Sequence, residues 1–90
     1  MNSGNILGRA QYLLAEDRQD TYGDARDTHQ KIADMWSMIL GCPVRPHQVA
    51  MCMVAVKLVR ATKSPAHADS YIDAAAYAAL AGEFATKEQA

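Results

Sequence analysis

The apolar residues of this chain recur at helical rather than strand spacing, and this periodicity limits the fold more than any other feature. Apolar positions three and four residues apart mark one face of an α-helix, whereas a strand alternates at every second residue. The clearest helical stripe comprises Ile32, Met35, Trp36, Ile39 and Leu40. No stretch shows a strand pattern, and no internal repeat is present. The sequence therefore predicts an all-α fold.

The residues between the stripes predict four helices, over about 5–18, 25–41, 46–61 and 66–85. Gly41 lies where a C-terminal cap is expected, and Pro46 suits the first position of a helix. From Val49 to Val59 nearly every residue is apolar, with Lys57 the exception. Because a helix that is apolar all round is buried on most sides, we expect the third helix to lie at the centre of a compact bundle.

Ninety residues are enough for one domain, which we expect to span 1–90, near the lower limit of independent folding. Half of the residues are hydrophobic, but there is only one Trp and one Phe, so the core consists of small side chains. Self-association would bury more apolar surface, and we expect a homo-oligomer. The net charge of −1 argues against general nucleic-acid binding, which needs a basic surface.

Several features predict a cytoplasmic protein without a membrane segment. The longest apolar stretch, Val49 to Val56, is too short to cross a bilayer. The first ten residues lack the charged segment and apolar run of a secretory signal. Cys42 and Cys52 do not have the spacing of a zinc site, and we expect Cys52 to be an inert, buried thiol.

Charged residues gather around the predicted turn between the third and fourth helices. Lys57 and Arg60 are three residues apart, and Asp69 and Asp73 are four apart, so each pair shares one helix face. Antiparallel pairing of the two helices would bring Arg60 opposite His67. Two interpretations remain open. Either the charges form a salt-bridge network that fixes the pairing of the helices, or the bases bind phosphate while the acids bind Mg²⁺ or a ribose hydroxyl.

Aromatic residues extend the candidate site. Tyr77 follows Asp73 by four residues and lies on the same face. In the segment before the second helix, Tyr22 could stack on a base while Arg18 reaches a phosphate; the alternative is an ordinary turn whose Tyr packs on the core. We expect His29, at the start of the second helix, to be solvated.

Several ordered motifs resemble a group of small phage and prophage proteins of unassigned function. They are R-x-x-x-YGD from Arg18, I-A-x-M-W-S from Ile32, V-A-M-x-M from Val49, K-L-x-R from Lys57, and H-x-D-S-x-x-D-x-x-x-Y-A-A-L from His67. The chain is also similar to the nucleotide-modification-associated domain of phages, which shares the YG turn, the K-x-x-R and the D-x-x-x-D-x-x-x-Y pattern.

More distantly, the chain resembles the all-α nucleoside triphosphate pyrophosphohydrolases of the MazG type. Those proteins are helical bundles that assemble into dimers or tetramers and bind Mg²⁺ through E-x-x-E and E-x-x-D motifs. Here no E-x-x-E is present, and D-x-x-x-D, from Asp69 to Asp73, stands in place of E-x-x-D. The resemblance implies an oligomer that binds nucleotides, with its catalytic acids incomplete.

The leading hypothesis is a phage-encoded protein that binds a nucleotide without turnover and sequesters a nucleotide immune signal of the host. Asp69 and Asp73 are candidate Mg²⁺ ligands. The whole predicted ligand-binding set is Arg18, Tyr22, Lys57, Arg60, His67, Asp69, Asp73 and Tyr77. Two alternatives stay open. One is a Mg²⁺-dependent pyrophosphohydrolase or nucleotide-modification factor, and the other is a helical interaction module that inhibits a host protein.

Overall fold

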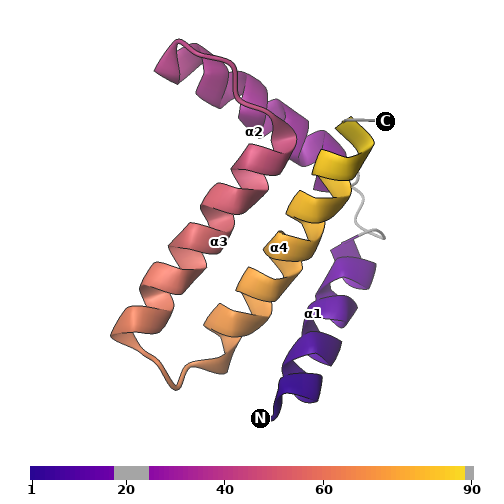
Figure 1. Ribbon diagram of the computed structural model, residues 1–90, viewed down its shortest axis with the longest axis vertical. Helices are drawn as coiled ribbons and strands as arrows, with labels where there is room; N and C mark the ends of the chain where they lie inside the picture. Colours follow the sequence, from indigo (N-terminus) through magenta and orange to yellow (C-terminus); the bar gives the residue numbers. More distant parts are fainter. Residues whose placement is uncertain (18–24, 89–90) are drawn as a thin grey trace.

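A computed structural model describes residues 1–17 and 25–88 and contains, in these ranges, four helices and no strand. They are α1 (Ser3–Asp17), α2 (Ala25–Leu40), α3 (Pro46–Lys63) and α4 (Ala68–Glu88), shown in Figure 1. The predicted all-α fold is confirmed, and each predicted helix bound lies within a few residues of the observed one. Neither Arg18 nor Tyr22 is among the described residues.

Local hydrogen bonds cap the start of α1 and the end of α2. Before α1, the Asn5 amide donates to Asn2 Oδ1 at 2.8 Å, and the Asn2 amide donates back to Asn5 Oδ1 at 3.2 Å. These bonds satisfy amides that the first turn of a helix leaves without a partner. At the end of α2, Gly41 has φ 71° and its amide donates to the Ser37 carbonyl at 2.9 Å. The predicted glycine cap is confirmed.

The connections around α3 are equally local. Pro46 begins α3, and the preceding Arg45 amide donates to Gln48 Oε1 at 2.9 Å. Between α3 and α4 the loop is closed by the Tyr71 hydroxyl, which donates to the Pro65 carbonyl at 2.8 Å. Helix α4 therefore begins two residues later than predicted, after His67, because residues 64–67 are used by this turn.

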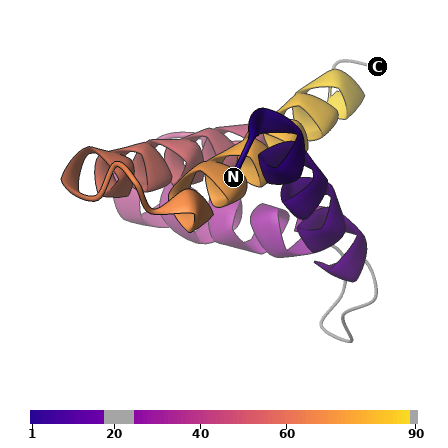
Figure 2. The same ribbon diagram turned by 90° about the horizontal axis from the view of Figure 1, so that it is seen from below.

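Helix α4 occupies the centre of the fold. It runs antiparallel to α3, with which it shares the largest helix–helix interface, and α1 packs on its other side (Figure 1). Helix α2 packs on α3 and crosses one face of the α3–α4 pair (Figure 2). The core is built mainly of small side chains, as the composition predicts. One buried cluster joins Ala10, Ile72 and Ala76, and a second joins Ala50, Ala81 and Phe84.

The prediction that α3 is buried on most sides is wrong. Val49 and Ala50 are fully buried, but Met51, Leu58 and Val59 are each exposed by half or more. Cys52, expected to be buried, is exposed as well. The reason is that α3 contacts only α4 and α2 extensively, so a large part of its circumference has no neighbour.

Helix α2 also leaves apolar residues uncovered. Met38 and Ile39 are 74% and 71% exposed, and Met35 and Leu40 are exposed by more than half. Trp36, which the stripe places in the core, is only half-buried. Figure 1 shows the cause, because the second half of α2 extends beyond the α3–α4 pair. No helix among the described residues is long and apolar enough to cross a membrane.

Candidate functional site

Two cavities meet at one ion pair between α3 and α4. The larger, of about 790 Å³, is lined by residues of all four helices. The smaller, of about 320 Å³, lies beside the turn between α3 and α4. Lys57 and Asp73 line both cavities, so this pair marks the point where they adjoin.

The Lys57 ammonium lies 3.0 Å from Asp73 Oδ2, and the two side chains are only 16% and 32% exposed. An antiparallel hairpin centred on Lys63, which places Arg60 opposite His67, would place Lys57 opposite Ser70. The observed partner, Asp73, lies about one turn further along α4. Helix α3 continues to Lys63, and the loop that follows moves the centre of the hairpin two residues along the chain. Low exposure strengthens the attraction between the two charges, because less water screens them, although removing them from water offsets part of this gain.

The smaller cavity collects five of the residues singled out in the sequence, namely Lys57, Arg60, His67, Asp69 and Asp73. Their predicted proximity is observed; whether they bind a ligand stays a prediction.

Three further residues of this cavity, Lys63, Ser64 and Ser70, were not singled out as site residues in the sequence. Ser70 is buried and lies 3.4 Å from His67 Nδ1 through its Oγ. Lys63 also lines the cavity. Its position three residues after Arg60, in the last turn of α3, could have identified it. With Lys63 included, three bases face two acids here, so the local charge is positive although that of the whole chain is −1.

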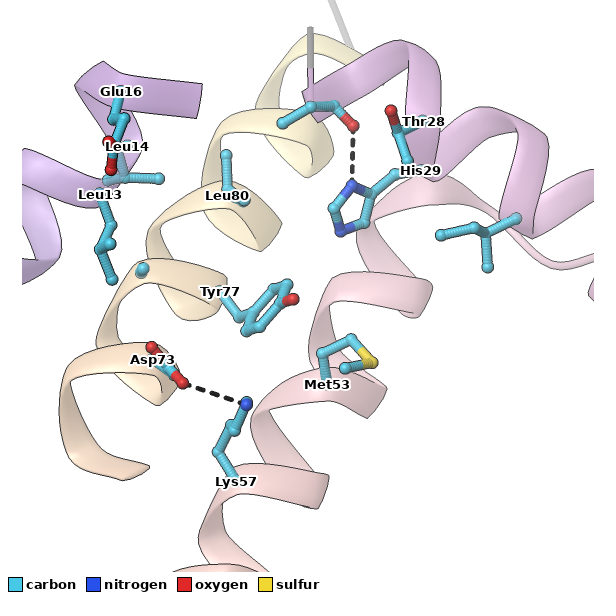
Figure 3. A pocket seen from close by; sticks show the side chains of 13 residues that line it. Leu13, Leu14, Glu16, Thr28, His29, Met53, Lys57, Asp73, Tyr77 and Leu80 are labelled. Carbon is cyan, nitrogen blue, oxygen red and sulfur yellow. Dashed lines mark hydrogen bonds and ion pairs between the residues drawn. The ribbon is translucent and has the colours of Figure 1, made fainter. Parts of the chain in front are cut away.

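The larger cavity has mainly apolar walls. Tyr77 lies on α4, one turn beyond Asp73, and Figure 3 shows its ring between the Lys57–Asp73 pair and His29. The apolar lining residues come from all four helices, and they include Leu13, Leu14, Ile32, Met53 and Leu80. The cavity therefore combines an apolar body with a charged end.

His29 is buried rather than solvated, which corrects the expectation from the sequence. It is 6% exposed, and its ring lies 5.1 Å from that of Phe84 and 6.1 Å from that of Tyr77, centroid to centroid. The first turns of α2 lie against the α3–α4 pair, so the inner face of α2 begins at His29 and continues at Ala33. The four-residue spacing of these two residues was the available signal.

The two candidate Mg²⁺ ligands, Asp69 and Asp73, do not form a complete metal site by themselves. Asp69 and Asp73 both line the smaller cavity, but the Asp73 carboxylate is already paired with Lys57. Among the described residues, no group of three His, Cys, Asp or Glu lies close enough together to hold a metal ion. Because Mg²⁺ accepts one or two carboxylates together with substrate phosphates, the Mg²⁺ hypothesis for these two acids stays a prediction.

Comparison with known proteins gives this fold and site a family. Residues 5–85 match a family described as "Domain of unknown function (DUF6378)". The chain belongs to the DUF6378 family. Two relatives are the Gene 55 proteins of Mycobacterium phages L5 and D29, which are 32% identical over 77 residues and 34% identical over 76 residues. Both alignments cover 84% of this chain.

The DUF6378 chain spans about half the length of these curated relatives, since the alignments cover 49% and 50% of them. No solved structure matches it significantly. The resemblance to a phage family of unassigned function is confirmed at the level of the family. The more distant likeness to MazG-type enzymes stays a prediction.

Proposed function

We propose that this DUF6378 domain binds a small ligand of the nucleotide type and does not hydrolyse it. The observation that carries the proposal is the junction of an apolar cavity with a positively charged one at Lys57. A volume of about 790 Å³ lies within the range of roughly 300–1,000 Å³ of small-molecule sites. A nucleotide has the matching division into a flat ring and an anionic group.

In this arrangement the base lies in the larger cavity against Tyr77, and the phosphate lies at the smaller one. Lys57, Arg60 and Lys63 supply the cationic groups, all from the last two turns of α3. Hydrogen bonds from such groups to phosphate oxygens are charge-assisted and are among the strongest that proteins make. The Lys57 ammonium lies 3.0 Å from the Asp73 carboxylate, so a phosphate competes with Asp73 for this group.

Binding without turnover is favoured because the acids that would carry metal-dependent hydrolysis are few and one is engaged. Asp73 is paired with Lys57, Asp69 is the other acidic residue of the smaller cavity, and Glu16 is the other acidic residue of the larger one. In a phage-infected cell, a cytoplasmic protein of this kind would sequester a nucleotide signal used in host defence. The phage origin of the two Gene 55 relatives supports this setting.

The test is a thermal-shift screen with AMP, ADP, ATP, cyclic nucleotides and ADP-ribose, with and without Mg²⁺. A ligand at about 100 times its Kd adds about 2.7 kcal/mol to the free energy of unfolding. The double variant Lys57→Ala/Arg60→Ala should lose nearly all of the shift, with an affinity reduced at least about a hundredfold, because each of the two charge-assisted bonds is worth about 1.5–3 kcal/mol.

The matched control is Lys31→Ala/Lys87→Ala, which removes the same charge from exposed positions in surface ion pairs. This control should bind the ligand as the unmodified chain does. Equal binding by Lys57→Ala/Arg60→Ala would refute the proposed phosphate position. Release of phosphate or pyrophosphate only in the presence of Mg²⁺ would favour the enzyme instead.

We also propose that the uncovered end of α2 is closed by a second copy of the chain. Residues 35–40 contain no charged side chain, and Met35, Met38, Ile39 and Leu40 are exposed by more than half. A domain of 90 residues buries too little apolar surface to leave such a patch in water without a stability cost. A monomer in solution would instead favour a host protein as the occupant of this surface.

A further inference from the structure

His29 lines the larger cavity and carries an unsatisfied polar atom. The side chain is more than nine-tenths buried, and its Nε2 atom is shielded from solvent. That nitrogen has no hydrogen-bond partner among the described residues. Buried polar atoms in native structures nearly always have a partner, so an orphaned one points to a missing ligand group or water.

The hydrogen bond of the other ring nitrogen, Nδ1, determines whether Nε2 is a donor or an acceptor. His29 Nδ1 lies 2.7 Å from the Ala25 carbonyl oxygen. A carbonyl oxygen can only accept, so Nδ1 must carry a proton and donate. In the neutral imidazole, Nε2 then holds a lone pair and acts as a hydrogen-bond acceptor. The group that satisfies it must be a donor, such as an amino, ring N–H or hydroxyl group.

Neighbouring rings hold this acceptor in one orientation. Phe84 and Tyr77 both pack at a tilt against the imidazole, with interplanar angles of 58° and 59°. A turn of the ring would break the short bond to Ala25 and the contacts with both aromatic rings. Figure 3 shows the edge of the imidazole opposite its hydrogen bond directed toward Tyr77, another residue that lines the cavity. The direction of the acceptor is thus fixed before a ligand arrives, and a ligand donor reaches Nε2 once the side chains that shield it give way.

We infer that His29 is the polar specificity residue of the larger cavity, and that it selects a flat, uncharged heteroaromatic ring carrying a hydrogen-bond donor. The inference deepens the proposed function and rests on it for the identification of that ring as a nucleobase. The apolar walls take the faces of the ring, Nε2 takes the donor at its edge, and the cationic cavity is left to the phosphate.

The first measurement uses the free protein and needs no ligand. Long-range ¹H–¹⁵N NMR spectra, recorded slightly above neutral pH, distinguish a protonated ring nitrogen from one with a lone pair. His29 should show a proton on Nδ1 and a lone pair on Nε2, with its signals assigned by their loss in His29→Gln. A proton on Nε2 would overturn the inference, because the cavity would then present a donor.

The second measurement compares two neutral probes, benzimidazole and 1-methylbenzimidazole, which differ in the only N–H donor. Benzimidazole should shift the Nε2 resonance and bind about three- to tenfold more tightly, the range expected for one net hydrogen bond between neutral groups. In His29→Phe, which keeps an aromatic ring but removes the acceptor, the two probes should bind equally. Equal binding to the unmodified chain, or an unmoved Nε2 resonance, would overturn the inference.

The test of His29 can fail or succeed independently of the test of the proposed function. Neutral probes need no ammonium group, so Lys57→Ala/Arg60→Ala should bind benzimidazole as the unmodified chain does, while it loses AMP. If AMP binds through Lys57 and Arg60 but the two probes are not distinguished, the His29 inference alone fails. If the probes are distinguished but no nucleotide binds, the proposed function alone fails. Should His29→Phe not fold, the measurements on the unmodified chain still decide.

Discussion

Replacing Asp73 by Asn should weaken the fold and strengthen the binding of a phosphate, because carboxylate and phosphate compete for the Lys57 ammonium. The two groups are 3.0 Å apart. At an effective dielectric constant of about 20 their gross attraction is about 5.5 kcal/mol, most of which desolvation and side-chain ordering offset. Partial burial places the net value between exposed pairs, about 0.2–1 kcal/mol, and buried ones, about 3–5 kcal/mol. We expect a loss of about 1–2 kcal/mol.

The effect on affinity has the opposite sign. A phosphate at Lys57 would lie about 6 Å from the Asp73 carboxylate and be repelled by about 0.7–2.8 kcal/mol, for effective dielectric constants between roughly 80 and 20. Removing this charge should tighten binding by about three- to hundredfold at low salt. The gain should shrink as the ionic strength rises, since salt screens charges that water can reach.

Two measurements on one variant check both signs. Urea unfolding gives the free energy of unfolding, and calorimetric titration with AMP gives the affinity at two salt concentrations. Asp34→Asn is the control. Asp34 is exposed on α2 and lines neither cavity, so this substitution removes the same charge at a distance from the site. A fall in affinity in Asp73→Asn would refute the reasoning. It would mean that Asp73 contacts the ligand itself, through a ribose hydroxyl or Mg²⁺.

Three further predictions concern the fold and assembly. Phe84→Ala, at a residue 1% exposed, should lower the free energy of unfolding by about 3–5 kcal/mol in urea; a loss below about 1 kcal/mol would contradict its place in the core. Gly8→Ala, in α1 with open space around an added Cβ, should raise the free energy of unfolding by about 1 kcal/mol and the melting temperature with it. Gly41→Ala, at φ 71°, should lower the free energy of unfolding by about 1 kcal/mol, and melting temperatures that shift in the same direction for both variants would be contrary evidence. Ile39→Asp should move sedimentation toward the monomer, whereas an unchanged oligomer would exclude the end of α2 as the interface.

The positions of the helices could be predicted because their limits are set locally. Gly41 and Pro46 act through their own backbone geometry, and neither depends on what the helix packs against. Burial could not be predicted in the same way. The apolar run of α3 indicates that the helix can be buried, but the number of its neighbours depends on how α1 and α2 cross the hairpin. For that reason Cys52 is exposed within an apolar segment.

The candidate site shows the same division between local and tertiary information. The pairing of bases on α3 with acids on α4 follows from helix periodicity and an antiparallel hairpin, and the contact between Lys57 and Asp73 agrees with it. The predicted register of the α3–α4 hairpin differs from the observed one by about one turn, because helix periodicity does not fix the length of the 64–67 loop. His29 was placed on the wrong face. Its spacing from Ala33 shows that the two share a face, but the crossing of α2 over the hairpin decides that this face is the inner one.

The larger cavity also has a consequence for how the chain opens. The protein's own contacts join the helices mainly in pairs, α1 to α4, α4 to α3 and α3 to α2, whereas the cavity wall draws on all four. Amide hydrogens of α1 should therefore exchange with solvent through local openings that leave the α3–α4 hairpin intact. A ligand in the cavity would contact α1 and α2 together. The rates of amide hydrogen exchange in these two outer helices should therefore fall in parallel as ligand is added.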